Sequence, residues 1–208
     1  MKRSLLVLGC GGHGRVVADA AIESGYDEVA FLDDAAPMQH RSVRVLGRFA
    51  AMADFASAWS AAIAAVGNSD LRLKLFQDLR QLGFETPNIV HPSAIVSRGA
   101  FLGNGVFVAA GAIINTGARI DDAVIVNTGA RIDHDCEIGA GSHIAPGVTL
   151  SGSVVVGRQS WLGTGCSVRQ GVRIGEGVMV GVGAAVVSDL ADCLTYAGVP
   201  ARVLKNAR

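Results

Sequence analysis

A glycine-rich turn near the start of the chain has the spacing of a phosphate-binding site. The stretch LLVLGCGGHGRVV places Gly9, Gly11 and Gly14 as G-x-G-x-x-G directly after an apolar run. Glycines there let backbone N–H groups approach a phosphate, which the positive end of the following helix attracts. Asp33 and Asp34 end the second predicted strand about 20 residues on, where a ribose-binding acid stands in dinucleotide sites. The turn predicts a nucleotide site and leaves open whose phosphate it holds.

A histidine between two acids is the second candidate for chemistry. Asp133, His134 and Asp135 are consecutive. A neutral imidazole accepts a proton near neutral pH, and a neighbouring carboxylate fixes its tautomer and stabilises the imidazolium. The three residues could therefore supply a general base and its orienting group. The alternative is a solvated corner of the fold without a catalytic role.

The first 86 residues have the pattern of a small parallel α/β domain. Strand-like runs (LLVL, EVAFL, AIAAV) alternate with helix-like stretches. In SDLRLKLFQDLRQLGF, leucines recur at helical spacing, Asn68 or Ser69 can cap the start, and Gly83 can end the helix. A domain this short has no second mononucleotide half for a nicotinamide, so the pattern favours a single nucleotide over a redox cofactor.

After this domain an aliphatic residue recurs at every sixth position. The ladder comprises Val90, Val96, Leu102, Val108, Ile114, Ile120, Val126, Ile132, Ile138, Ile144, Leu150, Val156, Leu162, Val168, Ile174, Val180 and Val186. Four positions after each, small or slim side chains predominate. Such steps describe flat faces joined by tight corners, with three faces to an 18-residue coil, and they predict a parallel β-helix.

Residues 18 apart stack on adjacent coils of such a β-helix. His134 then lies between Thr116 and Gly152. His143 lies beside Trp161, and the side chains of His143 and Trp161 point away from the core. Cys136 and Cys166 occupy the small inward position and are interpreted as inert core thiols.

Composition narrows the class of partner. The formal net charge is zero and no block of like charge occurs, which argues against nucleic acid. The apolar run before the glycines is too short to span a membrane, and the four cysteines form no C-x-x-C pair. We therefore expect a cytoplasmic protein that binds small molecules and neither membranes nor nucleic acid. The flat, weakly charged faces of the β-helix predict a closed oligomer.

The motifs together resemble one family. The hexapeptide ladder followed by AGVPAR resembles the hexapeptide acyltransferase superfamily. GCGGHGRVV, FLDD, AVGNSDLRLKL and NTGARIDHDCEIGAGSHIAPGV are similar to its bacterial sugar O-/N-acyltransferases, which act on sialic acid or on nucleotide-linked 4-amino-4,6-dideoxy sugars. The resemblance implies a left-handed β-helix, a homotrimer and acetyl-CoA as acyl donor. It implies a nucleotide-sugar domain at 1–86, a β-helix at 87–190 and a tail at 191–208 that contributes to the CoA site.

The resemblance also implies roles for individual residues. His134 is the general base, Asp135 its polarising partner, and the backbone amide of Gly152 the oxyanion donor. His143 lies near the thioester carbonyl, or alternatively in an aromatic stack at the trimer interface. Further CoA contacts are Gly163, Gly181, Gly198, Pro200 and Ala201, with Arg202 or Lys205 meeting the phosphates. The nucleotide sugar contacts Gly11, Gly12, His13, Asp33, Asp34, Gly67 and Asn68, with Arg72 as a possible further contact.

The implied reaction is acetyl-CoA-dependent N-acetylation of a nucleotide-linked amino sugar in bacterial surface-glycan synthesis. O-acetylation of sialic acid remains an alternative, as does a nucleotide sensor without catalysis. A metal-dependent β-helix hydratase is the most remote alternative. His134 and His143 are half a coil apart and His91 shares neither stacking column, so three histidines cannot gather and we expect no metal. The base of the nucleotide depends on the loop at 37–44 and stays open.

Overall fold

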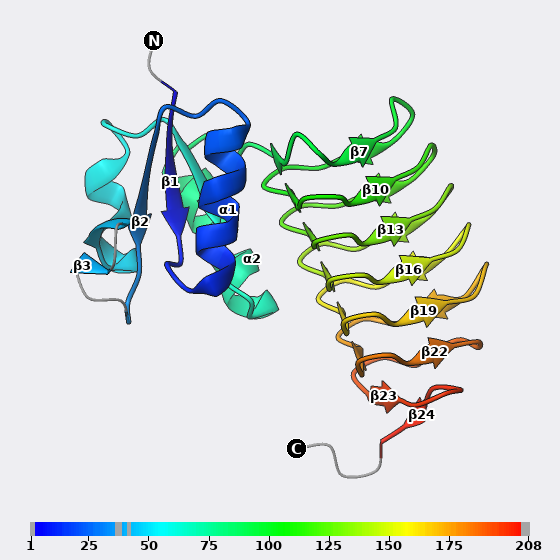
Figure 1. Cartoon of the computed structure of the whole chain (residues 1–208). Helices are drawn as coiled ribbons and strands as arrows, with labels where there is room; N and C mark the ends of the chain where they lie inside the picture. The colour runs from blue at the N-terminus through cyan, green and yellow to red at the C-terminus, as the bar shows by residue number, and fades with distance from the viewer. Residues whose placement is uncertain (1–2, 36–38, 41–42, 205–208) are drawn as a thin grey trace.

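The computed structural model describes residues 3–35, 39–40 and 43–204, which form an α/β domain followed by a β-helix (Figure 1). Lys205 and residues 37, 38, 41 and 42 of the loop at 37–44 lie outside this part. The α/β domain holds a five-stranded sheet in the order β3-β4-β2-β1-β5, parallel except for the β3–β4 pair. Its elements are β1 (Ser4–Leu8), α1 (Gly12–Glu23), β2 (Glu28–Leu32), β3 (Gln39–His40), β4 (Val43–Gly47), the 3₁₀-helix η1 (Phe49–Phe55), β5 (Ala61–Ala64) and α2 (Ser69–Gln81).

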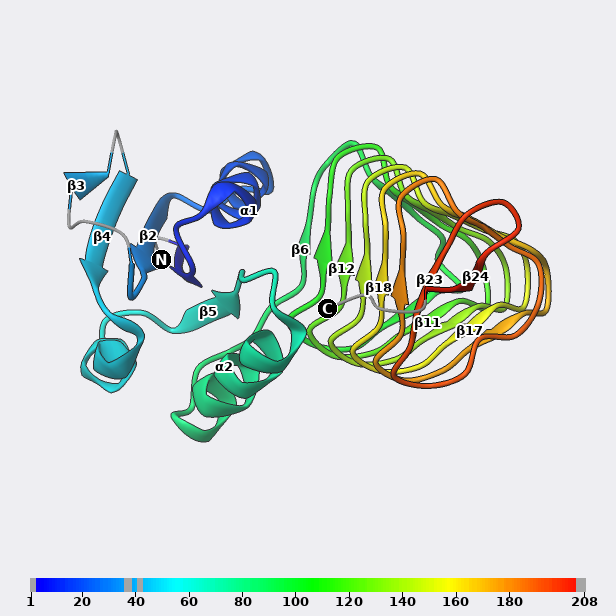
Figure 2. The same ribbon diagram turned by 90° about the horizontal axis from the view of Figure 1, so that it is seen from below.

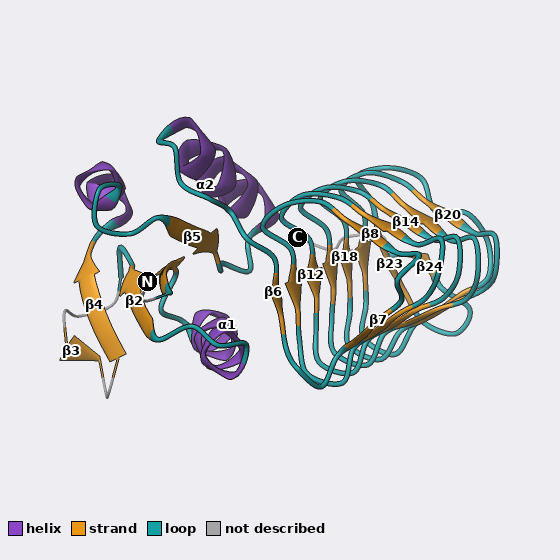
Figure 3. Cartoon of the chain, turned by 90° about the horizontal axis from the view of Figure 1, so that it is seen from above, coloured by secondary structure: helices purple, strands orange, loops and turns teal. Residues whose placement is uncertain are grey.

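The predicted strands and the second helix are confirmed. Asn68 caps α2 by accepting a hydrogen bond from the amide of Leu71, and Gly83 follows the helix with φ +83°. Leu75 and Leu79 are buried, whereas Leu71 is 38% exposed. Alternate residues of β1 face opposite sides, so α1 covers one face of the sheet and α2 with η1 covers the other. Strand β5 is left at the edge nearest the β-helix (Figure 3).

The β-helix has three parallel sheets built from two-residue strands. We name them the domain-facing sheet and the first and second outer sheets. The domain-facing sheet comprises β6 (Ile89–Val90), β9 (Phe107–Val108), β12 (Ile125–Val126), β15 (His143–Ile144), β18 (Trp161–Leu162) and β21 (Met179–Val180), extended by β23 (Thr195–Ala197) and antiparallel β24 (Arg202–Val203). The first outer sheet comprises β7 (Ile95–Val96), β10 (Ile113–Ile114), β13 (Arg131–Ile132), β16 (Thr149–Leu150), β19 (Ser167–Val168) and β22 (Ala185–Val186). The second outer sheet comprises β8 (Phe101–Leu102), β11 (Arg119–Ile120), β14 (Glu137–Ile138), β17 (Val155–Val156) and β20 (Arg173–Ile174).

Strand register follows the 18-residue period. Ile114 pairs with Ile132 and Ile132 with Leu150, each one coil further along. The ladder residues fill the core with the small inward residues, among them Cys136 and Cys166, both fully buried. Seen from the C-terminal end in Figure 2, the chain turns clockwise as it advances toward the viewer, which is a left-handed coil.

The described part of the α/β domain packs on one face of the β-helix. On the α1 side, Val17 shares an apolar cluster with Ile89, Phe107 and Ile125, which project outward from the domain-facing sheet. On the α2 side, Leu73 and other apolar residues cluster with coil residues between the strands. The corner between the two outer sheets therefore lies on the opposite side of the β-helix (Figures 2 and 3). We call this corner, which carries residues 133–136, the far edge.

Candidate active site

The histidine at the far edge is held by both flanking acids. His134 Nδ1 lies 2.8 Å from Asp135 Oδ2, and the backbone N–H of His134 donates to Asp133 Oδ1 at 2.8 Å. Asn115, one coil earlier, donates to the same Asp133 oxygen at 2.8 Å. The hydrogen bond to Asp135, supported by the charge of Asp133, raises the pKa of His134 above its ordinary value. The side chain of His134 is 48% exposed, and its Nε2 has no hydrogen-bond partner among the described residues.

Two glycines make room for this pair. A β-carbon at Gly152 would lie 2.5 Å from both Cε1 and Nε2 of His134, so the imidazole rests directly on that backbone. A β-carbon at Gly117 would overlap a carboxylate oxygen of Asp135. Asp135 has a left-handed φ of 58°, which turns its side chain toward the imidazole. The predicted stacking of His134 on Gly152 is therefore confirmed.

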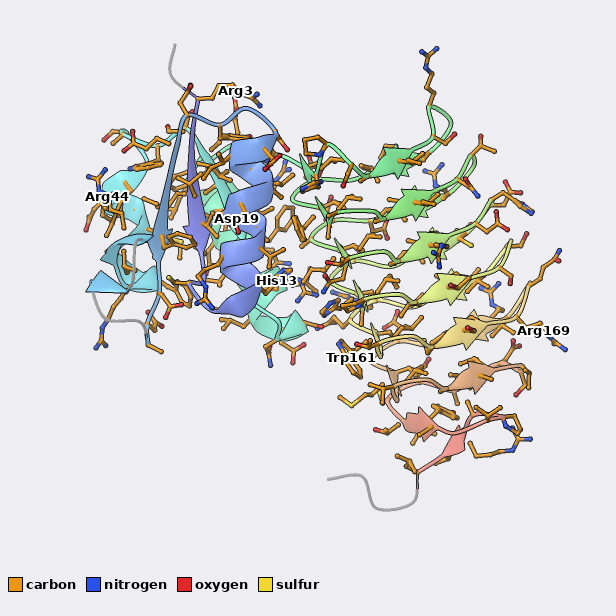
Figure 4. The ribbon with its side chains drawn as sticks, viewed as in Figure 1. Arg3, His13, Asp19, Arg44, Trp161 and Arg169 are labelled. Carbon is orange, nitrogen blue, oxygen red and sulfur yellow. The ribbon has the colours of Figure 1, made fainter. Side chains whose placement is uncertain are left out.

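The second histidine lies on the other side of the β-helix. His143 begins β15 in the domain-facing sheet and stacks in register with Trp161, their ring centroids 6.5 Å apart. In Figure 4, Trp161 lies on the side near the α/β domain, whereas Arg169, two coils beyond Asp133 in the same column, points away from that domain. His134 and His143 of one chain thus lie on opposite sides of the β-helix.

His143 is covered by the start of α1. The ring of His13 lies 6.2 Å from that of His143 and 5.4 Å, edge-on, from that of Phe107. Asn127 Nδ2 lies 3.0 Å from His143 Nε2. Burial, aided by the nearby positive charge of Arg72, lowers the pKa of His13 to about 4 and that of His143 to about 3. Both imidazoles are neutral at physiological pH, and His13 Nε2 is buried without a hydrogen-bond partner among the described residues.

The glycine-rich turn contains two kinds of glycine. Gly9 has φ +114°, and a β-carbon at Gly14 would overlap the Gly9 carbonyl oxygen, so the fold itself requires both. A β-carbon at Gly11 or Gly12 would meet nothing within 4 Å. Packing therefore does not explain these two glycines, and they border open space at the N-terminus of α1.

The two acids after β2 shape the loops beside this turn. Asp33 accepts the backbone N–H of Cys10 at 2.6 Å and that of Ala35 at 2.8 Å. Asp34 accepts the backbone N–H of Phe49 at 2.9 Å. Both carboxylates lie at the carboxyl end of β2, beside the corresponding end of β1, where ligands bind to parallel sheets. Their role as nucleotide contacts stays a prediction.

A cavity of about 650 Å³ lies between the start of α2 and the β-helix. It is lined on one side by Gly67, Asn68, Ser69 and Asp70, and on the other by Gln159, Trp161, residues 176–179 and Cys193. Two residues predicted to hold a nucleotide sugar thus share a cavity with the tryptophan that contacts His143. A β-carbon at Gly67 would meet nothing within 4 Å.

Arg72, predicted as a possible contact of the nucleotide sugar, is buried between α2 and the β-helix. It is 1% exposed, and its guanidinium donates to the backbone carbonyls of Val66, Gly67, Ala123 and Gly141. A direct contact with a nucleotide sugar stays a prediction, and the guanidinium is already taken up by carbonyl oxygens.

The other predicted CoA residues follow one edge of the domain-facing sheet. Gly163 and Gly181 stack on adjacent coils, and a β-carbon at either would press on the next coil. The backbone of Gly198 and Ala201 is hydrogen-bonded to Ala185, which fixes the turn that includes Pro200 on the last coil. Arg202 donates to the Ala201 carbonyl at 2.8 Å. Gly152, by contrast, lies at the far edge, away from these residues.

Two family models match the chain. Residues 4–79 match the PglD N-terminal domain, and residues 117–152 match the bacterial transferase hexapeptide (six repeats). A GDP-perosamine N-acetyltransferase of Escherichia coli O157:H7 is 30% identical over 148 residues, which cover 69% of this chain and 67% of that protein. The chain belongs to the hexapeptide-repeat acyltransferases.

Solved structures extend the likeness of this acyltransferase over nearly its whole length. The acetyltransferase domain of PglB from Neisseria gonorrhoeae FA1090, in complex with acetyl coenzyme A, is 40% identical with a TM-score of 0.95, covering 98% of this chain and 100% of that one. PerB from Caulobacter crescentus, in complex with CoA and GDP-perosamine, is 39% identical with a TM-score of 0.93, covering 97% of both chains.

Sequence reasoning missed several residues that shape the acyltransferase site. Asn127 was not singled out, although it precedes His143 by 16 residues and so stacks beside it. Ile89, Phe107 and Ile125 form an outward apolar column at 18-residue spacing, a pattern that could have identified the face on which the α/β domain packs.

The described residues of the acyltransferase contain no group of three histidine, cysteine or acidic side chains placed to hold a metal ion. Among the same residues, no helix is both long and apolar enough to cross a membrane.

Proposed function

We propose that this acyltransferase moves the acetyl group of acetyl-CoA to the amine of a nucleotide-linked 4-amino-4,6-dideoxy sugar. The observation that carries the proposal is the His134–Asp135 pair at 2.8 Å, with a half-exposed imidazole that rests on Gly152. Gly11 and Gly12, whose packing leaves room for a side chain, supply a phosphate site for the acceptor. The GDP-perosamine bound by PerB is an acceptor of this chemical class.

The chemistry requires one base and one oxyanion site. His134 removes a proton as the amine attacks the thioester carbonyl, and Asp135 stabilises the imidazolium. The amide N–H of Gly152 donates to no acceptor among the described residues and lies beside the imidazole, where it stabilises the tetrahedral oxyanion. Collapse of that intermediate expels the CoA thiolate, which takes the proton back from His134.

The site is assembled from two copies of the chain in a homotrimer. The α/β domain covers the domain-facing sheet, and His134 stands on the far edge, so a sugar bound to one copy is acetylated by His134 of its neighbour. CoA lies in the crevice between them, past His143, Gly163 and Gly181. Because acetyl-CoA and nucleotide sugars are made in the cytoplasm, we place the reaction there, as a step of surface-glycan synthesis.

Release of free CoA thiol tests the proposal. Wild-type protein is assayed with acetyl-CoA and GDP-, UDP- and dTDP-linked 4-amino-4,6-dideoxy sugars, and with free sialic acid as an O-acceptor. Turnover with one nucleotide amino sugar supports the proposal and identifies the nucleotide. Turnover with sialic acid alone would establish the O-acetyltransferase, and nucleotide binding without thiol release would establish a sensor. In the active case, His134→Ala lowers kcat by about 10³-fold while the oligomer persists.

A further inference from the structure

Arg72 is a cation buried at the junction of the two domains. From the first turn of α2 its Nε donates to the carbonyl of Ala123 at 2.9 Å, and Nη2 donates to the carbonyl of Gly141. Ala123 and Gly141 belong to successive coils of the β-helix. Desolvation lowers the pKa of Arg72 to about 10, which leaves the guanidinium charged at neutral pH. Among the described residues no carboxylate pairs with it, so carbonyl dipoles alone compensate the buried charge.

The same guanidinium holds the loop after β5. Its Nη1 donates to the Val66 carbonyl at 2.8 Å and to the Gly67 carbonyl at 3.1 Å. Gly67 and Asn68 line the 650 Å³ cavity, so one side chain connects the cavity wall to two coils of the β-helix. Such a planar fork of donors is specific to arginine, because lysine presents a single ammonium.

The coil and the loop that Arg72 connects differ in their other hydrogen bonds. The coil at 141–142 is fixed by its ladder, with Gly141 N–H donating to Asp122 and Ser142 N–H to Gly139. The loop at 66–67 follows the last hydrogen bond of β5, in which Ala65 N–H donates to Leu8. Loss of the guanidinium therefore leaves the Val66 and Gly67 carbonyls without these hydrogen bonds, whereas the coil keeps its own.

We propose that Arg72 is a positioning residue for the acceptor: it sets the loop that carries Gly67 and Asn68 against the β-helix without touching the substrate. The inference rests on the proposed function, because the cavity wall it fixes is where the nucleotide sugar is placed. Burial, aided by the positive charge of Arg72, lowers the pKa of His13 and of His143 beside this loop and keeps both imidazoles neutral.

The test compares Arg72→Met and Arg72→Lys with wild type. We expect Arg72→Met to raise KM for the nucleotide amino sugar at least tenfold while KM for acetyl-CoA changes less than twofold. Arg72→Lys keeps the charge and part of the hydrogen bonding, so it recovers part of the loss. Two variants serve as controls. Lys74→Met removes an exposed cation of the same helix. Ser24→Ala removes another contact between the domains, the hydrogen bond from Ser24 Oγ to the Val90 carbonyl. Both controls keep wild-type KM values.

Two measurements separate this role from a general loss of stability. A lower melting temperature with unchanged KM values, or equal changes in both KM values, would overturn the proposal. NMR titration of the imidazoles should show higher pKa values for His13 and His143 in Arg72→Met, and unchanged values would also count against it. If Arg72→Met does not assemble, Arg72→Lys carries the KM comparison.

Failure of the proposed function gives a different result. If wild-type protein turns over no nucleotide amino sugar, binding of GDP by calorimetry replaces KM. A weaker Kd for GDP in Arg72→Lys, with wild-type affinity in Lys74→Met, still supports the positioning role. Equal GDP affinity in wild type and Arg72→Lys overturns it.

Discussion

The imidazole of His134 rests on the α-carbon of Gly152, so that a β-carbon at residue 152 would lie 2.5 Å from Nε2 and Cε1. Gly152 does not have a left-handed φ, so an alanine can adopt its backbone conformation. The atoms nearest to the added β-carbon belong to the imidazole of His134, which must therefore move. We expect Gly152→Ala to lower kcat by about 10²-fold, because a displacement of about 1 Å at a base has that effect. Steady-state kinetics of the single and double variants check this. In a His134→Ala background, Gly152→Ala should add little, and an equal further loss would contradict the contact.

Asp135 is expected to set the pH dependence of the reaction. Its hydrogen bond is the largest cause of the raised pKa of His134, and the base works only when deprotonated. The activity of wild type therefore rises with pH through a midpoint above the ordinary histidine value. Asp135→Asn should move this midpoint of kcat/KM to lower pH and reduce the plateau by about 10²-fold or more.

Asp133 provides the matched control for this pH profile. It bonds the backbone N–H of His134 and acts on the imidazole only through its charge, so Asp133→Asn should shift the midpoint in the same direction by less. An Asp135→Asn enzyme with the wild-type midpoint would remove Asp135 from its assigned role.

The glycine-rich turn allows binding to be separated from folding. Gly11→Asp adds a carboxylate where a β-carbon has free space, so we expect a wild-type melting temperature and at least a tenfold higher KM for the nucleotide sugar, from repulsion of its phosphates. Gly14→Ala places a methyl group on the Gly9 carbonyl and should lower the melting temperature sharply. Calorimetric melting and KM measurements distinguish the two. Normal KM in Gly11→Asp would exclude the turn from phosphate binding.

The sequence predicts the β-helix well because its cause is local and repeated. One aliphatic residue in six must face the core, and the buried Ile114, Ile132 and Leu150 follow from that period without knowledge of distant contacts. The Asn68 cap is equally local. Handedness came from the family resemblance, because the hexapeptide period is the same for either hand.

What the period cannot predict is which face receives the α/β domain. The family resemblance implied Arg72 as a possible further ligand contact, yet its partners include Ala123 and Gly141, some 51 and 69 residues away. A cation at the start of a helix has the same local pattern whether it binds phosphate or distant carbonyls. Similarly, the outward direction of His143 followed from the ladder, whereas its burial against His13 depends on packing between domains.

Complementation between two inactive variants tests the assembly of the site. His134→Ala removes the base from the far edge, and Gly11→Asp blocks the acceptor domain, so neither homotrimer should be active at low nucleotide-sugar concentration. The Gly11→Asp copy keeps an intact far edge, and the His134→Ala copy keeps an intact α/β domain. If the site joins the far edge of one copy to the domain of its neighbour, every mixed trimer contains one interface at which both parts are intact. Random equimolar mixing should then restore about a quarter of the wild-type sites in the whole mixture and about a third in the isolated mixed trimers. Co-expression with two affinity tags, isolation of the mixed species and thiol-release assays measure this recovery. A mixed trimer as inactive as its parents would mean that each copy uses its own His134, which would contradict the placement of the domain and the far edge on opposite sides.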